Sequence, residues 1–184
     1  EEAEEVGEVA VDTETTSLDP HQADLVGISL CSKIGKACYI PVGHKSPKCI
    51  KKDAVIKKLK KLLEDPSIKK IGQNIKFDFI VFYKHGIILS SIEDTMLMSY
   101  VLDVGKNRHN MDTLSEIHLG HKTISFKEMV GTGKKEINFS EVEIDKAKDY
   151  AAEDADVTLR LYKKFNKNLK SEKMINIYEI FEKP

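Results

Sequence analysis

The sequence predicts a single α/β domain in which one mixed sheet is flanked by helices. Two observations support this prediction. Short apolar segments rich in β-branched residues come first, separated by turns, and segments with apolar residues at helical spacing follow and alternate with a further strand. This order is typical of one sheet covered by helices. The length of 184 residues suits one ordinary domain, which buries roughly 70% of its unfolded surface.

The expected strands are short and come early in the chain. Residues 8–12 form a compact apolar segment that predicts a buried strand. Residues 25–31 and 36–40 predict two more strands, joined by a glycine-containing turn at 33–35. A fourth short strand is predicted at 68–71. The first three strands therefore form a meander, and later elements alternate with helices.

The expected helices follow the apolar spacing of the remaining segments. The segment after residue 49 repeats apolar positions every three or four residues with lysines between them, which predicts an amphipathic helix. The helix after the fourth strand is expected to end near Gly86, because glycine commonly follows a helix C-terminus. The predicted helices span residues 50–63, 76–83, 92–101, 111–119 and 141–169.

Composition argues against several classes of protein. Hydrophobic residues make up 41% and charged residues 32% of the chain, which is typical of a folded domain. No apolar run approaches the ~20 residues of a membrane helix, and no signal peptide is recognisable. The three cysteines form no CxxC pair, which argues against a disulfide scaffold or a cysteine-rich zinc site. We therefore expect a cytoplasmic protein without a membrane partner.

Charge gives a weaker indication. The net charge of −1 comes from 29 basic and 30 acidic residues and by itself does not favour nucleic acid as a ligand. Lysines are concentrated in residues 45–70. Two interpretations stay open for them, the solvated face of a helix and a patch that faces phosphates. The chain begins at Glu1 without a methionine, so we expect a piece of a longer polypeptide.

The long helix contains a carboxylate where its pattern requires an apolar residue. Asp154 occupies the missing position of the inward stripe, and Tyr150 lies one turn before it. A lone carboxylate that faces a core costs several kcal/mol unless it is paired, protonated or bound to metal. An arginine or a backbone N–H beside Asp154 is the structural alternative. The other members of the stripe are Ala147, Ala151, Thr158, Leu161 and Phe165.

Two further acidic sites follow predicted strands. Alternation along the first strand puts Asp12 and Glu14 on one face, at the carboxyl end where α/β sheets place ligands. After the fourth strand, Asn74 is expected to cap a helix whose first turn contains Asp78. The structural alternatives are a solvated strand end and an acid that interacts with the helix dipole.

Together these elements bring four carboxylates and one tyrosine toward one end of the sheet. Oxygen ligands of this kind suit hard cations, Mg²⁺ or Mn²⁺. Two such ions roughly 4 Å apart stabilise both oxygens of an in-line phosphoryl displacement.

Three segments resemble the exonuclease motifs of the proofreading domain of bacterial DNA polymerase I. These are residues 11–15 (VDTET), 73–78 (QNIKFD) and 150–158 (YAAEDADVT). The resemblance extends over nearly the whole chain and implies a ribonuclease H-like fold of the four-carboxylate, tyrosine-type branch. It also implies an exonuclease domain at 1–170 and a lead-in toward a polymerase domain at 171–184. Further similar segments lie at residues 39–42, 94–97, 108–112 and 122–126.

The resemblance implies a role for each site residue. Asp12, Glu14 and Asp154 would hold one divalent metal ion. Asp12 would bridge to a second ion that Asp78 supports directly or through water. Tyr150 would orient the attacking water. Residues similar to those that hold the DNA 3′ end are Thr15, Leu18, Gln73, Asn74, Phe77, Met96, Arg108 and Phe126.

The activity implied is removal of nucleoside 5′-monophosphates from single-stranded or frayed DNA 3′ ends. The cofactors would be two Mg²⁺ or Mn²⁺ ions, and the partner would be the polymerase domain of the same polypeptide, in a monomer. Phe77 departs from the family, which commonly has tyrosine there. Two alternatives stay open, an exoribonuclease of the same fold, similar to the ribonuclease D group, and a silent module that braces a polymerase. We expect Asp94 to cap one helix and Asp112 to start another.

Overall fold

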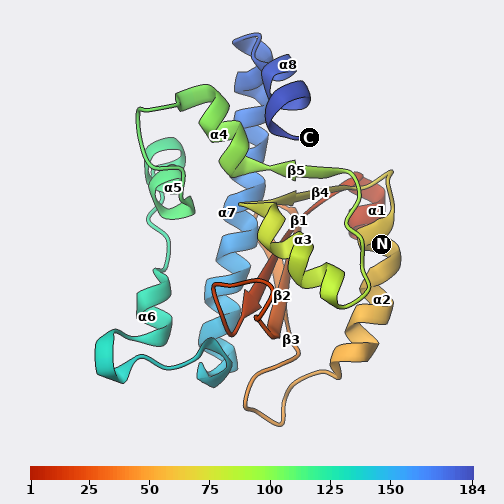
Figure 1. The fold of residues 1–184 in the computed structure, drawn as a ribbon, viewed down its shortest axis with the longest axis vertical. Coiled ribbons are helices and arrows are strands. Elements are labelled where there is room, and N and C mark those ends of the chain that lie inside the picture. The colour runs from red at the N-terminus through yellow and green to blue at the C-terminus, as the bar shows by residue number, and fades with distance from the viewer.

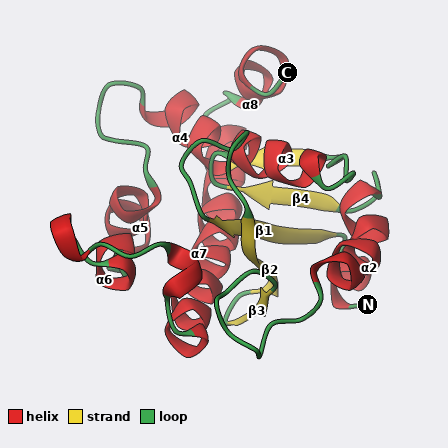
Figure 2. Ribbon diagram, turned by 60° about the horizontal axis from the view of Figure 1, so that its bottom comes forward, coloured by secondary structure: helices red, strands yellow, loops and turns green.

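The sheet is the centre of the molecule in this computed structural model (Figures 1 and 2). The structure describes the backbone of residues 1–184 and the side chains of all of them except Lys134. The strand order is β3-β2-β1-β4-β5. The strands span β1 Glu8–Thr15, β2 Leu25–Lys33, β3 Lys36–Pro41, β4 Lys69–Gly72 and β5 Ile92–Asp94.

The pairing makes the sheet mixed, as predicted. β1 pairs antiparallel with β2, and β2 pairs antiparallel with β3. β1 pairs parallel with β4, and β4 pairs parallel with β5. β1 is therefore the central strand, and its carboxyl end lies beyond the short parallel pairing with β4, which involves only Glu8, Val9 and Ala10. Residues 11–15 extend past β4, so side chains from helices can reach them.

Helices cover both faces of the sheet. On one face, α7 packs across β1, β2 and β3 (Figure 1). On the other face, α2 and α3 bury the side of β1 that contains Val11. The longer helices span α2 Lys52–Glu64, α3 Ile75–Lys84, α4 Thr95–Asp103, α5 Met111–Leu119 and α7 Ile144–Ser171. Shorter ones are α1 Glu2–Val6, α6 Phe126–Val130 and α8 Ile175–Ile177.

Small residues on α7 explain how closely this helix approaches the sheet. Ala147, Ala151 and Ala155 are fully buried. The absence of bulky side chains at these positions lets the helix backbone lie near β2, and the 28-residue length of α7 then spans the sheet from end to end. The larger members of the stripe, Leu161 and Phe165, fill the core beyond the strands.

Four sequence predictions were wrong in part. Asp112, expected to start a helix, lies inside the first turn of α5, and Asn110 precedes that helix. Residues 92–94 are a strand, so the helix predicted at 92–101 begins only at Thr95. The long helix begins at Ile144, after a separate 3-10 turn at Phe139–Glu141. Asn74 precedes α3, but its side chain makes no capping bond. The other predicted strands and helices are confirmed to within a few residues.

No helix in the described part of the chain is both long and apolar enough to cross a membrane.

Candidate active site

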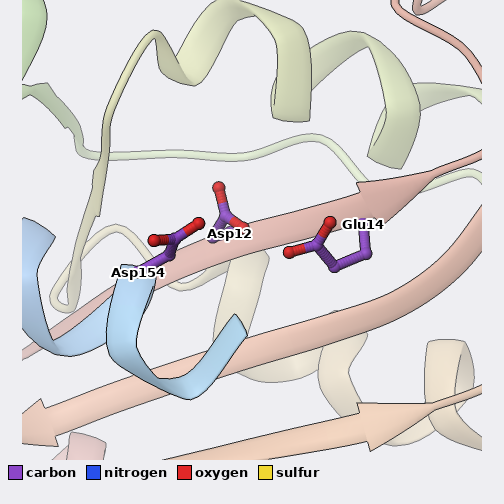
Figure 3. Close-up of side chains that lie close together, drawn as sticks. All are labelled: Asp12, Glu14 and Asp154. Carbon is purple, nitrogen blue, oxygen red and sulfur yellow. The ribbon is translucent and has the colours of Figure 1, made fainter. Parts of the chain in front are cut away.

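Three carboxylates meet at the carboxyl end of β1. Asp12 and Glu14 point from one face of the strand, and Asp154 points toward them from α7 (Figure 3). One oxygen from each side chain lies within 4.8 Å of one oxygen from each of the others. The strand alternation and the interrupted stripe of α7 therefore converge on one place. Glu14 and Asp154 are only 6% exposed, so water screens their charges little.

Burial and mutual repulsion make the ionised forms of these carboxylates costly. Burial raises the pKa of Asp12 to about 6. Burial also raises the pKa of Glu14 well above its ordinary value, and the charges of Asp12, Asp154 and Asp78 raise it further. The pKa of Asp154 is raised mainly by burial and then by the charge of Asp12. A cation among these groups would remove both costs, which is the behaviour expected of a metal site.

Tyr150 lies one helical turn before Asp154, with its hydroxyl beside that carboxylate. The hydroxyl opposes the rise in the pKa of Asp154. Burial raises the pKa of Tyr150 itself far above its ordinary value, so the phenol stays protonated. The ring of Tyr150 packs against Phe139 and Phe126, with centroids 6.0 and 6.3 Å away. The hydroxyl is thus fixed beside the three carboxylates.

Asp78 approaches the site from α3. It lies in the first turn of α3, and its Oδ1 accepts hydrogen bonds from the backbone N–H and the hydroxyl of Thr13, at 2.9 and 2.6 Å. It is 2% exposed and lies outside the group of three carboxylates. Burial and the charge of Asp12 raise its pKa, while the bonds from Thr13 oppose that rise. Asp78 therefore differs from the other three acids in its hydrogen-bond partners, although its charge still acts on Glu14.

A hollow of about 400 Å³ opens above the carboxylates. Asp12, Glu14, Tyr150 and Asp154 form part of its lining. Its apolar walls come from Leu18, Phe77, Phe126, Ile137 and Phe139. Leu18 is 92% exposed on the loop after β1, so its side chain is accessible to a ligand in the hollow. The hollow thus combines an acidic floor with apolar walls.

Comparison with known proteins gives this arrangement a family. The family model described as 3′-5′ exonuclease matches residues 1–170. The chain belongs to the 3′–5′ exonuclease family.

Relatives and structural neighbours of this exonuclease domain agree with that assignment. DNA polymerase I of Pseudomonas aeruginosa is 47% identical over 165 residues, which cover 86% of this chain and 18% of that protein. The chain spans about a fifth of the length of the curated relatives it matches. The structure of Brucella melitensis NrnC with bound Mg²⁺ superposes with a TM-score of 0.71 at 26% identity, covering 92% of this chain and 77% of that one. Escherichia coli RNase D, an exoribonuclease, superposes with a TM-score of 0.67 at 20% identity over 92% of this chain and 42% of that one, which shows a shared fold alone.

The residues predicted to hold a DNA 3′ end lie in different places in the structure. Thr15, Leu18, Phe77 and Phe126 line the hollow above the carboxylates. Asn74 and Met96 line a second hollow of about 420 Å³, beside α3 and α4.

The remaining two predicted residues, Gln73 and Arg108, do not line the hollow above the carboxylates. Gln73 bonds within the protein, donating to His109 O at 2.7 Å and accepting from the Thr95 hydroxyl at 2.5 Å. Arg108 lies exposed on the loop between α4 and α5. The structure therefore brings together half of the predicted set.

Sequence reasoning missed one wall of the hollow, the segment 136–139. Phe139 is 2% exposed and stacks on Phe126 at 6.0 Å. Asn138 donates from Nδ2 to Thr16 O at 2.9 Å, which ties this wall to the loop that contains Leu18. The segment contains no periodic apolar pattern, and the bond joins residues 122 positions apart, so no local signal indicated either contact.

Proposed function

We propose that this exonuclease domain removes nucleoside 5′-monophosphates one at a time from the 3′ end of DNA, as the proofreading domain of a DNA polymerase I. The convergence of Asp12, Glu14 and Asp154 beneath a hollow with apolar walls is the observation that carries this proposal. A phosphodiester placed on the acidic floor puts its terminal base against those walls. The relatives named DNA polymerase I favour DNA over RNA as the substrate.

The donor set fits divalent metal ions. Asp12, Glu14 and Asp154 would hold one ion, and Asp12 with Asp78 would support a second. Their ligand atoms are all carboxylate oxygens, which suit Mg²⁺ or Mn²⁺ rather than softer ions. When bound, such ions lower the pKa of water and stabilise the charge that develops on the leaving 3′ oxygen.

Tyr150 would orient the attacking water. If it directs its hydroxyl proton to Asp154, its oxygen lone pairs would accept a hydrogen bond from water. Its raised pKa makes it a fixed dipole rather than a base. Leu18 and Phe126 would stack with the terminal bases, and each stacked base contributes about 1–3 kcal/mol. Frayed ends are then preferred, because a base must leave its duplex to reach the hollow.

In this proposal, residues 1–170 are the exonuclease domain and residues 171–184 lead toward the polymerase domain of the same polypeptide. The extent of the family match and the small share of each relative that the chain covers support this division. A neighbouring polymerase domain would raise the local concentration of 3′ ends for a domain whose net charge is only −1. The exonuclease domain would act as a monomer.

The test is digestion of 5′-labelled single-stranded DNA with Mg²⁺, with Mn²⁺ and with EDTA. We expect a ladder that shortens from the 3′ end, depends on metal and disappears in Asp154→Asn. An RNA strand of the same sequence, digested in parallel, distinguishes the exoribonuclease alternative. Intact DNA in every lane, with a folded protein by circular dichroism, would support the bracing-module alternative and contradict the proposal.

A further inference from the structure

The sheet itself places additional side chains beside the carboxylates. Across β1, β2 and β3, Asp12 is in register with Ser29 and then Tyr39. The neighbouring row joins Glu14 to Gly27 and then Pro41. Because residues in register on adjacent strands point to the same face, Tyr39 shares the face of the carboxylates.

Gly27 makes room for the Tyr39 ring next to Glu14. A Cβ atom on Gly27 would lie 2.0 Å from the Tyr39 hydroxyl oxygen and 2.2 Å from the ring carbon that bears it. The tyrosine ring therefore lies over Gly27, the residue that pairs with Glu14 across the two strands. Burial and then the charge of Glu14 raise the pKa of Tyr39, which agrees with this proximity.

His44 fixes the tilt of that ring. Its Nε2 lies 2.6 Å from the Tyr39 hydroxyl, and its Nδ1 lies 3.0 Å from Val142 O. A carbonyl only accepts, so Nδ1 carries the proton. In a neutral imidazole Nε2 must then accept, and Tyr39 donates. The direction of both bonds is thus determined, and Tyr39 has one favoured orientation.

The same histidine also contacts the Tyr150 side of the site. His44 packs against Phe139 with centroids 5.9 Å apart, and Phe139 packs against Tyr150 at 6.0 Å. A part-buried hydroxyl–imidazole pair costs more to desolvate than an apolar pair of similar shape, so its presence beside Glu14 indicates more than space filling.

We propose that Tyr39 and His44 are positioning residues that hold the Glu14 side chain, through the ring seated over Gly27, in the orientation in which it binds the metal ion. This inference rests on the proposed function, because it takes Glu14 as a metal ligand. Side chains of this kind orient ligands without touching the ion, and their loss commonly weakens metal binding.

The test measures Mn²⁺ affinity by isothermal titration calorimetry on the 184-residue chain without DNA. We expect Tyr39→Phe, which keeps the ring and loses the hydroxyl bond, to weaken Mn²⁺ binding about fivefold, and Gly27→Ala to weaken it about tenfold or more. Tyr162→Phe is the matched control, a buried tyrosine on α7 whose hydroxyl accepts from Lys69 instead. It should bind Mn²⁺ like the wild type.

A kinetic readout separates positioning from a general loss of structure. The Mn²⁺ concentration for half-maximal activity should rise in Tyr39→Phe, while KM for the oligonucleotide stays unchanged. If Tyr39→Phe binds Mn²⁺ as tightly as the wild type, the positioning inference is wrong and the proposed function stands. If the wild type binds no Mn²⁺, the metal site and the proposed function fail together. Should Gly27→Ala not fold, Tyr39→Phe alone decides.

Discussion

Two buried groups of acids lie at different strands of this sheet, and their partners differ. Asp94, at the end of β5, accepts from the backbone N–H groups of four residues, Asn74, Ile75, Met96 and Leu97, at 2.8–3.4 Å. Glu93 accepts from the Tyr178 hydroxyl at 2.9 Å and pairs with Lys183. At the end of β1, by contrast, the charges that act on Glu14 are those of three other carboxylates.

The contrast shows how to tell a structural acid from a functional one. Burial raises the pKa of Asp94 too, but hydrogen bonds from four backbone N–H groups oppose that rise. Through these bonds Asp94 caps the N-termini of α3 and α4. Asp12, Glu14 and Asp154 lie close together and repel one another when ionised, a cost that a bound cation would offset. Exchanging the two kinds of acid for neutral residues should therefore have opposite consequences.

We expect the largest effect from a substitution in the group at the end of β1, which consists of Asp12, Glu14 and Asp154, and we expect it on activity. Asp12→Asn should lower the rate of DNA digestion about 1,000-fold, which corresponds to about 4 kcal/mol of barrier, because it removes the ligand that both metal ions would share in the proposed function. The same substitution should leave the metal-free fold intact or more stable. Initial rates and thermal melts of one preparation check both statements, and a variant with wild-type rate would remove Asp12 from the site.

At the end of β5, where Glu93 and Asp94 lie, we expect a substitution to affect stability more than activity. Asp94→Ala removes bonds to the N-termini of α3 and α4 and should lower the free energy of unfolding by about 2 kcal/mol. Mn²⁺ affinity at low temperature should change much less than in Asp12→Asn. Urea denaturation and calorimetry measure the two quantities. Equal loss of both in Asp94→Ala would contradict the distinction between the groups.

A pH dependence of stability follows from the raised pKa values. Below about pH 4, Asp12 is protonated in both the folded and the unfolded chain. As pH rises, the unfolded chain loses this proton first, so the metal-free fold loses stability until pH passes the folded pKa of about 6. The amide that Asp12→Asn introduces has no proton to lose in this range. The Tm of the variant should thus exceed that of wild type by about 3 °C or more at pH 7.5 and by much less at pH 4.

Metal should reverse this dependence. Mg²⁺ binds the ionised carboxylates, so it should raise the wild-type Tm at pH 7.5 and have little effect at pH 4. If the Tm difference between metal-free wild type and Asp12→Asn is the same at pH 4 and pH 7.5, burial does not raise the pKa of Asp12.

Local periodicity explains which parts of the site could be predicted. Alternation in β1 put Asp12 and Glu14 on one face, and the interrupted stripe of α7 put Asp154 toward the sheet. Both patterns repeat within one element, so neighbouring residues specify them. The segment after the fourth strand indicated Asp78 in the same way. The resemblance to a known family added the wall residues, of which Leu18 and Phe126 line the hollow.

The parts that could not be predicted depend on contacts far apart in sequence. Residues 92–94 become a strand only because β4 is available to pair with them, and three residues show no period of their own. Asp94 was expected to cap one helix and caps two, since the second N-terminus arrives from α3. Asp112 lies inside α5, which Asn110 precedes, and accepts from the Thr123 hydroxyl.

Substitutions in the apolar walls of the hollow should lower activity less than substitutions of the acids. Leu18→Ala and Phe126→Ala should each raise KM for single-stranded DNA about tenfold, the equivalent of one lost stacking contact. The rate on bis(p-nitrophenyl) phosphate, a small diester that has no base, should be unchanged because it needs only the acidic floor. Tyr83→Ala, an exposed aromatic residue at the end of α3, is the matched control. A loss on the small ester would assign these side chains to the floor instead.

We expect the smallest effect from the hydrogen bond between Asn138 and Thr16 O, which joins the segment 136–139 to the loop that contains Leu18. Asn138→Asp keeps the oxygen that accepts from Ser140 N, but it replaces the Nδ2 donor and sets a carboxylate oxygen against Thr16 O. The loop that contains Leu18 should then move more freely, so KM for single-stranded DNA should rise about threefold while Mn²⁺ affinity stays constant. Asn138→Ala removes the acceptor as well and should lower Tm in addition. If Asn138→Asp changes Mn²⁺ affinity instead of KM, the segment 136–139 acts on the metal site rather than on the bound strand.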